Sequence, residues 1–140
     1  MFFTKAFSLI TAFLAVATQA SPTPEVGPVE VRIASTTHTG DVTFYTPGLG
    51  ACGHTNNANE FVAAAAAPVF DTFPGATANP NNNPICGKQT TVTYQGKSVT
   101  VTLVDRCPGC GNGGIDLSPA AFQRLASLDK GRLSGAQWSV

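Results

Sequence analysis

VDRCPGCGNGGIDLS, residues 104–118, places two aspartates, two cysteines and a run of glycines between two segments with regular patterns. Before it, residues 90–105 alternate polar and apolar side chains around a reversal at Gln95–Lys97, and this pattern predicts a β-hairpin with one buried face. After it, Ser118 as N-cap and Pro119 in the first helical position predict the start of a helix. The stretch therefore joins a hairpin to a helix, and its chemistry has to be decided from its aspartates and cysteines.

Three other segments carry secondary-structure signals. A short strand is expected at Val42–Tyr45, and a last strand, LSGAQWSV (133–140), would close the sheet with Trp138 in the core. The alanine run in EFVAAAAAPVF (60–70) is ambiguous, because alanine favours helix but the run is short and is closed by Pro68, as a buried strand would be. Several short strands with one short helix predict a small, mainly β barrel.

The N-terminal segment has the features of a secretory signal peptide. It has Lys5 near its start, an apolar stretch at 6–17, and the small residues Thr18 and Ala20 before a cleavage position. The apolar stretch is shorter than the roughly 18–20 residues that a membrane-spanning helix needs. We therefore expect a secreted, extracellular protein with a signal peptide at 1–20, a proline-rich leader at 21–39 and one domain at 40–140.

The composition argues against several classes of partner. The formal net charge is zero, with eight basic and eight acidic residues. There is thus no electrostatic reason to expect nucleic acid or an anionic membrane as a partner. The sequence has no dinucleotide-binding glycine fingerprint, and we expect neither a cofactor nor a metal. We expect the protein to be a monomer.

All four cysteines, Cys52, Cys86, Cys107 and Cys110, lie beyond the expected signal peptide. In an oxidising compartment, an even number in a short chain favours two disulfides, with the pairing left open. A zinc site would need a second Cys-x-x-Cys pair, and the first two cysteines are too far apart in the sequence to form one. A redox motif would need its first cysteine at a helix N-terminus, whereas the helix begins only at Ser118. We therefore favour a turn that is closed by a disulfide.

Asp105 and Asp116 allow two interpretations. Asp105 follows the apolar residues of a strand and is expected at the rim of the barrel, while Asp116 lies just before the helix N-cap, where the helix dipole favours a carboxylate. Two aspartates in one groove could cleave a glycosidic bond, one as acid and the other as base or nucleophile. The structural alternative is that Asp116 orders the start of the helix and that Asp105 binds turn amides or pairs with Arg106.

Several motifs in a fixed order resemble those of the RlpA-like, expansin-like and barwin-like double-psi β-barrels, in particular their small secreted single-domain fungal and actinobacterial members. The motifs are GDVTFY (40–45), GACG (50–53), VDRCPGC (104–110) and IDLS (115–118), and the resemblance extends over 40–140. It implies a six-stranded double-psi β-barrel with one or two short helices, in which the alanine run is a strand. It also implies the disulfides Cys52–Cys86 and Cys107–Cys110.

The same resemblance implies a binding site. The expansin pattern places the polar floor of a groove at Thr43, Asp105 and Asp116, with Tyr45 beside them. The aspartate that matters most for wall loosening in expansins corresponds to Asp116, and expansins are not regarded as hydrolases. We therefore expect a protein that is not an enzyme and that binds or loosens cell-wall polysaccharide, such as cellulose, chitin or peptidoglycan, through this groove.

Two other activities occur in families that this sequence resembles. Lytic transglycosylases carry a histidine after the alanine pair of the middle strand, but here that region is AAAAAPVF (63–70), and His38 and His54 lie elsewhere. Small inhibitors of papain-like cysteine proteases are similar in GLGACG (48–53), VDRCPGC and DLSPAAF (116–122). Loops held by disulfides suit that role, because they lose little entropy when they bind a protease cleft. A host-interaction effector is a further alternative.

Overall fold

A computed structural model describes Ser21 and residues 34–140. The expected signal peptide and most of the expected leader lie outside the described residues. Within 34–140 the strands and helices, in chain order, are β1 (Thr37–Phe44), β2 (Val62–Ala66), α1 (Ala67–Asp71), β3 (Gln89–Tyr94), β4 (Lys97–Cys107), β5 (Ile115–Leu117), α2 (Pro119–Phe122) and β6 (Leu133–Ser139). None of the described helices is long and apolar enough to cross a membrane.

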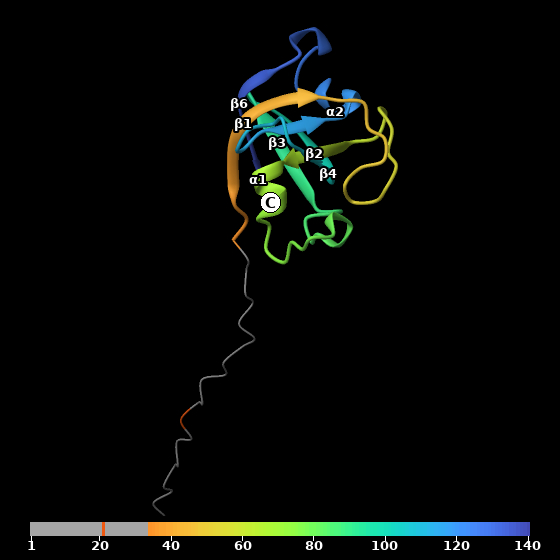
Figure 1. Ribbon diagram of the computed structural model, residues 1–140. Coiled ribbons are helices and arrows are strands. Elements are labelled where there is room, and N and C mark those ends of the chain that lie inside the picture. Colours follow the sequence, from red (N-terminus) through yellow and green to blue (C-terminus); the bar gives the residue numbers. More distant parts are fainter. Residues whose placement is uncertain (1–20, 22–33) are drawn as a thin grey trace, which may run out of the picture. The chain divides into compact units, whose positions relative to one another are not determined.

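The six strands close into a barrel, and Figure 1 shows the labelled strands β1, β2, β3, β4 and β6 in it. Their order around the barrel is β1-β5-β2-β4-β3-β6. The pairs β1–β5 and β2–β4 are parallel, and the other neighbours are antiparallel. A closed barrel leaves no strand edge without a partner, which is one way in which small β-proteins avoid edge-to-edge association. The structure confirms the six-stranded, mainly β barrel with two short helices that the resemblance implied.

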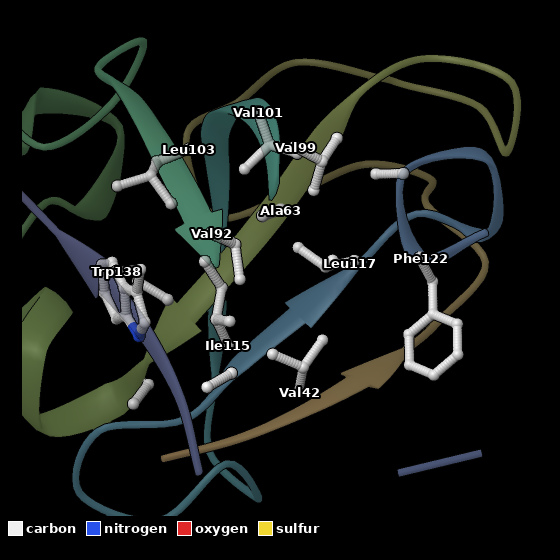
Figure 2. Packing of buried hydrophobic residues seen from close by; sticks show 14 of the residues in the cluster. Val42, Ala63, Val92, Val99, Val101, Leu103, Ile115, Leu117, Phe122 and Trp138 are labelled. Carbon is white, nitrogen blue, oxygen red and sulfur yellow. The ribbon is translucent and has the colours of Figure 1, made fainter. Parts of the chain in front are cut away.

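The barrel interior is filled by one cluster of apolar side chains. Figure 2 shows Val42, Val92 and Ile115, which come from β1, β3 and β5, around this interior. Trp138 of β6 is 2% exposed, as expected for a core residue, and its indole N–H donates to the carbonyl of Gly113 (2.9 Å). This bond satisfies the one polar atom that the large side chain brings into the core.

The alanine run divides between two elements. Residues 62–66 form β2, in which every residue is buried, and Pro68 lies in the first turn of α1, which follows at once. Proline is accepted there because the first turn of a helix does not use its N–H groups. The strand expected from the resemblance is therefore confirmed. Tertiary packing between β4 and β5 overrides the helical propensity of alanine over most of the run.

The first strand begins earlier than the sequence indicated. We expected it at Val42–Tyr45, but β1 begins at Thr37. The reason is non-local, because Thr37–Gly40 pairs with β6, from Ala136 to Ser139. At its other end β1 stops at Phe44, although the N–H of Tyr45 still donates to the carbonyl of Leu117 (2.9 Å).

The expected hairpin and helix start are both present. β3 and β4 pair with Val92 opposite Val99, and the connection has positive φ at Gln95 (47°) and Gly96 (78°), as in the tight turns that match strand twist. At the start of α2, Ser118 is the N-cap, and its hydroxyl accepts a hydrogen bond from the N–H of Ala121.

Two disulfides connect the cysteines as the resemblance implied, Cys52 to Cys86 and Cys107 to Cys110. Their sequence separations are 34 and 3. In the chain-entropy model the longer loop stabilises the fold by about 4 kcal/mol and the shorter one by about 2 kcal/mol. The first disulfide thus contributes chiefly to stability, while the second fixes the turn that precedes β5.

We predict that Gly113→Ala lowers the free energy of unfolding by about 1–3 kcal/mol, the usual cost of overpacking. A Cβ at Gly113 would lie 2.7 Å from the carbonyl oxygen of Thr39 in β1, so the two segments would have to separate. Gly109→Ala is the matched control in the same loop, because a Cβ there meets nothing within 4 Å. Urea denaturation of both variants measures the difference, and equal stabilities would contradict the prediction.

Candidate functional site

Four residues form a row across four neighbouring strands. Thr43 of β1 lies opposite Asp116 of β5, Asp116 lies opposite Ala64 of β2, and Ala64 lies opposite Asp105 of β4. Directly opposed residues of a sheet share one face. The neighbours of Thr43, Asp116 and Ala64 along their strands include Val42, Leu117 and Ala63 of the core, so this row lies on the outer face of the barrel wall. We call Thr43, Asp116, Ala64 and Asp105 the polar row.

Asp105 faces outward because of a β-bulge. In β4, Val101 and Leu103 point into the core, and strict alternation would place Asp105 there too. The register shifts instead: Leu103 pairs with Ala63, and Asp105 pairs with Ala64, which leaves Val104 as the extra residue. We expected Asp105 at the end of its strand, but β4 continues to Cys107. The outward direction is therefore set by the bulge and not by a strand end.

One oxygen of Asp105 binds two main-chain amides. Oδ1 accepts a hydrogen bond from the N–H of Ala51 (2.8 Å) and from that of Arg106 (2.8 Å). Gly50 packs directly against this carboxylate, since a Cβ at Gly50 would lie 3.2 Å from the carboxylate carbon Cγ of Asp105. Asp105 thus binds turn amides, as the structural alternative stated. The Arg106 guanidinium pairs with Asp71 (2.6 Å) and not with Asp105.

Asp116 is only partly exposed and is held by Thr43, whose hydroxyl donates to Oδ1 (2.8 Å). Burial raises the pKa of Asp116, and the charge of Asp105 acts in the same direction. The hydrogen bond from Thr43 and the charge of Arg132 lower that pKa, but they do not cancel the effect of burial. The expectation that the helix start would favour the charged carboxylate is therefore not met, because desolvation dominates.

Tyr45 completes the site at the end of β1. Burial raises the pKa of its phenol, and the negative charges of Asp105 and Asp116 raise it further. The hydroxyl therefore keeps its proton at neutral pH and is a hydrogen-bond donor next to two acceptors. The structure brings together all four residues that the sequence assigned to the groove.

The Cys107–Cys110 disulfide borders this site. The Cys107 Sγ lies 4.0 Å from Oδ2 of Asp116, and the two sulfurs and this carboxylate lie within 4.8 Å of one another. A sulfur in a disulfide carries no proton to donate and is not a thiolate, so the 4.0 Å contact is a packing contact. Zinc sites use thiolates, and this oxidised cluster offers only one carboxylate ligand.

Gly50 and Ala51, which position Asp105, were not singled out from the sequence as site residues. Both belong to the GACG motif, and that succession of small residues was the available signal. A residue without a side chain next to a short one lets the main chain approach a carboxylate closely. The contact itself joins positions that are 54 residues apart, and local patterns carry no information about it.

The double-psi β-barrel family model described as "Lytic transglycolase" matches residues 37–135. The chain belongs to this RlpA-like double-psi β-barrel family. A papain inhibitor of Streptomyces mobaraensis is 42% identical over 102 residues, which cover 71% of this chain and 68% of that protein. The solved structure of a Streptomyces papain inhibitor has a TM-score of 0.66 with 40% identity, and the match covers 74% of this chain and 92% of that one.

Two further relatives of this RlpA-like barrel match it over smaller shares of their own length. An expansin of Clavibacter michiganensis, solved as a mutant in complex with cellohexaose, has a TM-score of 0.59 with 25% identity; the match covers 75% of this chain and 50% of the expansin. An allergen homologue of Arthroderma benhamiae is 37% identical over 113 residues, or 71% of this chain and 38% of that protein. This chain therefore spans half or less of these two relatives.

We predict that Asp116→Asn is more stable than the unchanged protein at pH 7. Because the pKa of Asp116 is higher in the folded protein than its ordinary value near about 3.9, ionisation costs stability. That cost develops as the pH rises from the unfolded to the folded pKa, and it persists above both. The amide introduced by the substitution keeps an oxygen for the Thr43 hydroxyl but does not ionise.

Thermal denaturation from pH 3 to 8 tests this directly. The variant should have the higher melting temperature at pH 7, and the gap should close below about pH 4, where both side chains are neutral. Asp129→Asn, at an exposed carboxylate outside the site, is the control and should show no such gap. A variant of Asp116 that is less stable at pH 7 would contradict the assignment.

Proposed function

We propose that the polar row and Tyr45 form an open groove that binds cell-wall polysaccharide, and loosens it, without hydrolysis. The observation that carries this proposal is the outward-facing line of Thr43, Asp116 and Asp105 across adjacent strands, with a protonated phenol beside it. Carboxylates accept hydrogen bonds from sugar hydroxyl groups, and the phenol of Tyr45 can donate a hydrogen bond to a sugar oxygen. The expansin solved with cellohexaose, which shares this fold at 25% identity, supports the same class of ligand.

The contacts of Asp105 favour binding over cleavage. A glycosidase needs one carboxyl group as acid and a second that is free to act as base or nucleophile. Here the second carboxylate, Asp105, already accepts two main-chain hydrogen bonds through Oδ1. Asp105 is therefore held by the main chain, and only its Oδ2 is left to serve as base or nucleophile beside Asp116. Because the family description names lytic enzymes, an assay for released sugar has to accompany every binding measurement.

We propose further that the chain is exported and acts outside the cell. The N-terminal 20 residues have the order of features of a secretory signal, with a basic residue, an apolar stretch and small residues before a cleavage position. Both pairs of cysteines are oxidised in the structure, and such disulfides persist in secreted proteins. Mass spectrometry of the culture supernatant should find a mature chain that begins near Ser21.

We predict that Asp116→Asn weakens binding to insoluble polysaccharide by about tenfold or more, because it replaces a charged acceptor whose hydrogen bonds contribute about 1.5–3 kcal/mol each. The measurement is a pull-down on cellulose, chitin and peptidoglycan, with Asp129→Asn as the control that should bind normally. The supernatants are assayed for soluble sugars, and none is expected. Unchanged binding by Asp116→Asn would contradict binding through the groove. Release of soluble sugar would show that the protein cleaves the polysaccharide.

A second function is supported by a different observation, and we propose it as the alternative. The protein would inhibit papain-like cysteine proteases through its disulfide-held loops, as suggested by 42% identity to a papain inhibitor over most of the domain. Cys52 and Cys86 hold two loops together, so little ordering entropy would be lost on binding a protease.

We predict that the purified protein inhibits papain in a peptide-hydrolysis assay and that Asp116→Asn inhibits equally well, since its carboxylate belongs to the groove. The results of the binding assay and the inhibition assay, taken together, separate the two functions. Loss of polysaccharide binding with retained inhibition would assign the two activities to different surfaces. Absence of inhibition at a large excess over papain would remove the alternative.

A further inference from the structure

Residues 48–56, which follow β1, form a small hairpin. Leu49 and Thr55 form an antiparallel bridge near its open end. Two main-chain hydrogen bonds flank this pair, from Asn56 N–H to the Gly48 carbonyl (3.0 Å) and from Gly50 N–H to the His54 carbonyl (3.0 Å). We call residues 48–56 the Leu49 hairpin.

The main-chain groups of Leu49 point away from the hairpin. The hydrogen bonds of the bridge are made by the residues on either side of Leu49 and Thr55, so these two form a non-hydrogen-bonded pair. In such a pair the N–H and C=O of each residue face outward, where another chain can reach them. The outer edge at Leu49 therefore offers one donor and one acceptor to an added strand.

The side chain of Leu49 is also presented to the outside. It is 76% exposed, more than any other large hydrophobic side chain among the described residues, and the second exposed one, Phe61, reaches 38%. Glycines precede and follow Leu49, so no neighbouring side chain covers it, and a Cβ built at Gly48 meets nothing within 4 Å. A single exposed leucine is ordinary on a protein surface. Leu49 differs because it lies on a hairpin edge and its main-chain N–H and C=O have no hydrogen-bond partner among the described residues, so it can anchor a partner chain.

The Leu49 hairpin is fixed to the rest of the domain at its tip. Cys52 is bound to Cys86 by a disulfide, its N–H donates to the Val104 carbonyl (3.2 Å), and the N–H of Ala51 donates to Asp105 (2.8 Å). These three links lie between Gly50 and Gly53, at the tip opposite the Leu49 end. The conformation that a partner would bind is thus already formed, so the ordering cost that weakens flexible ligands is small.

We infer that the Leu49 hairpin is the protease-binding element, with the Leu49 side chain in a hydrophobic pocket of a papain-like protease cleft and its main chain paired with the cleft wall as an added strand. This inference rests on the second proposed function and locates its contact surface. Main-chain pairing supplies affinity in this binding mode, and the pocket that receives the side chain supplies specificity. Because the cleft itself is occupied, the inhibition is competitive with a peptide substrate.

The test compares three variants in the papain assay. Leu49→Ser should raise the inhibition constant by about 10- to 100-fold, the loss expected when a buried leucine anchor is removed. Leu49→Met keeps an apolar side chain of similar size and should stay within about threefold of the unchanged protein. Phe61→Ser removes the other exposed hydrophobic side chain and should likewise stay within about threefold. Circular dichroism and thermal melting establish that each variant is folded.

Each outcome has a distinct meaning. If the unchanged protein inhibits papain and Leu49→Ser inhibits equally well, the Leu49 hairpin is not the contact surface and this inference is overturned while the second function stands. A large loss in Phe61→Ser without a loss in Leu49→Ser would overturn it in the same way. If the unchanged protein does not inhibit papain at all, the second function fails and the inference fails with it. Noncompetitive kinetics would also contradict binding in the cleft.

Discussion

The hydrogen bonds of Asp105 are the contact on which both candidate surfaces depend. The bulge at Val104 turns this carboxylate away from an apolar core, where an unpaired charge would cost several kcal/mol. Once outside, its Oδ1 binds the N–H of Ala51 and holds the tip of the Leu49 hairpin against β4. The same side chain is one end of the polar row. A single local irregularity in one strand thus supports the polar row and the Leu49 hairpin together.

Most elements with short-range signals could be predicted from the sequence, and those defined by distant pairing could not. The β3–β4 hairpin and the Ser118 cap depend on residues within one turn or two strands, and both were predicted correctly. The start of β1 was placed too late, because its first residues are ordered by β6 at the other end of the domain. The alanine run remained ambiguous by propensity, and the resemblance gave the correct answer because burial between two strands decides it.

The site, too, was predictable only in part from the sequence. The resemblance named Thr43, Tyr45, Asp105 and Asp116; the barrel register aligns Thr43, Asp116 and Asp105, and the two aspartates act on the phenol of Tyr45. Their physical state could not be derived in advance. Alternation along β4 assigns Asp105 to the core, and only the pairing with β2 reveals the bulge. The helix start suggested a stabilised carboxylate at Asp116, but burial outweighs that effect, since the dipole of a four-residue helix is small.

The geometry also determines which aspartate can distinguish the two functions. Removal of Asp105 would release Ala51 and disturb the Leu49 hairpin as well as the polar row, so a loss of either proposed activity could not be assigned to one surface. Asp116 contacts Thr43 and the Cys107–Cys110 disulfide, and it has no hydrogen bond to the Leu49 hairpin among the described residues. Leu49 in turn lies on the hairpin edge, outside the polar row. Asp116 and Leu49 therefore form the pair of positions at which the two surfaces can be changed independently, since changes at sites without shared contacts have nearly additive effects.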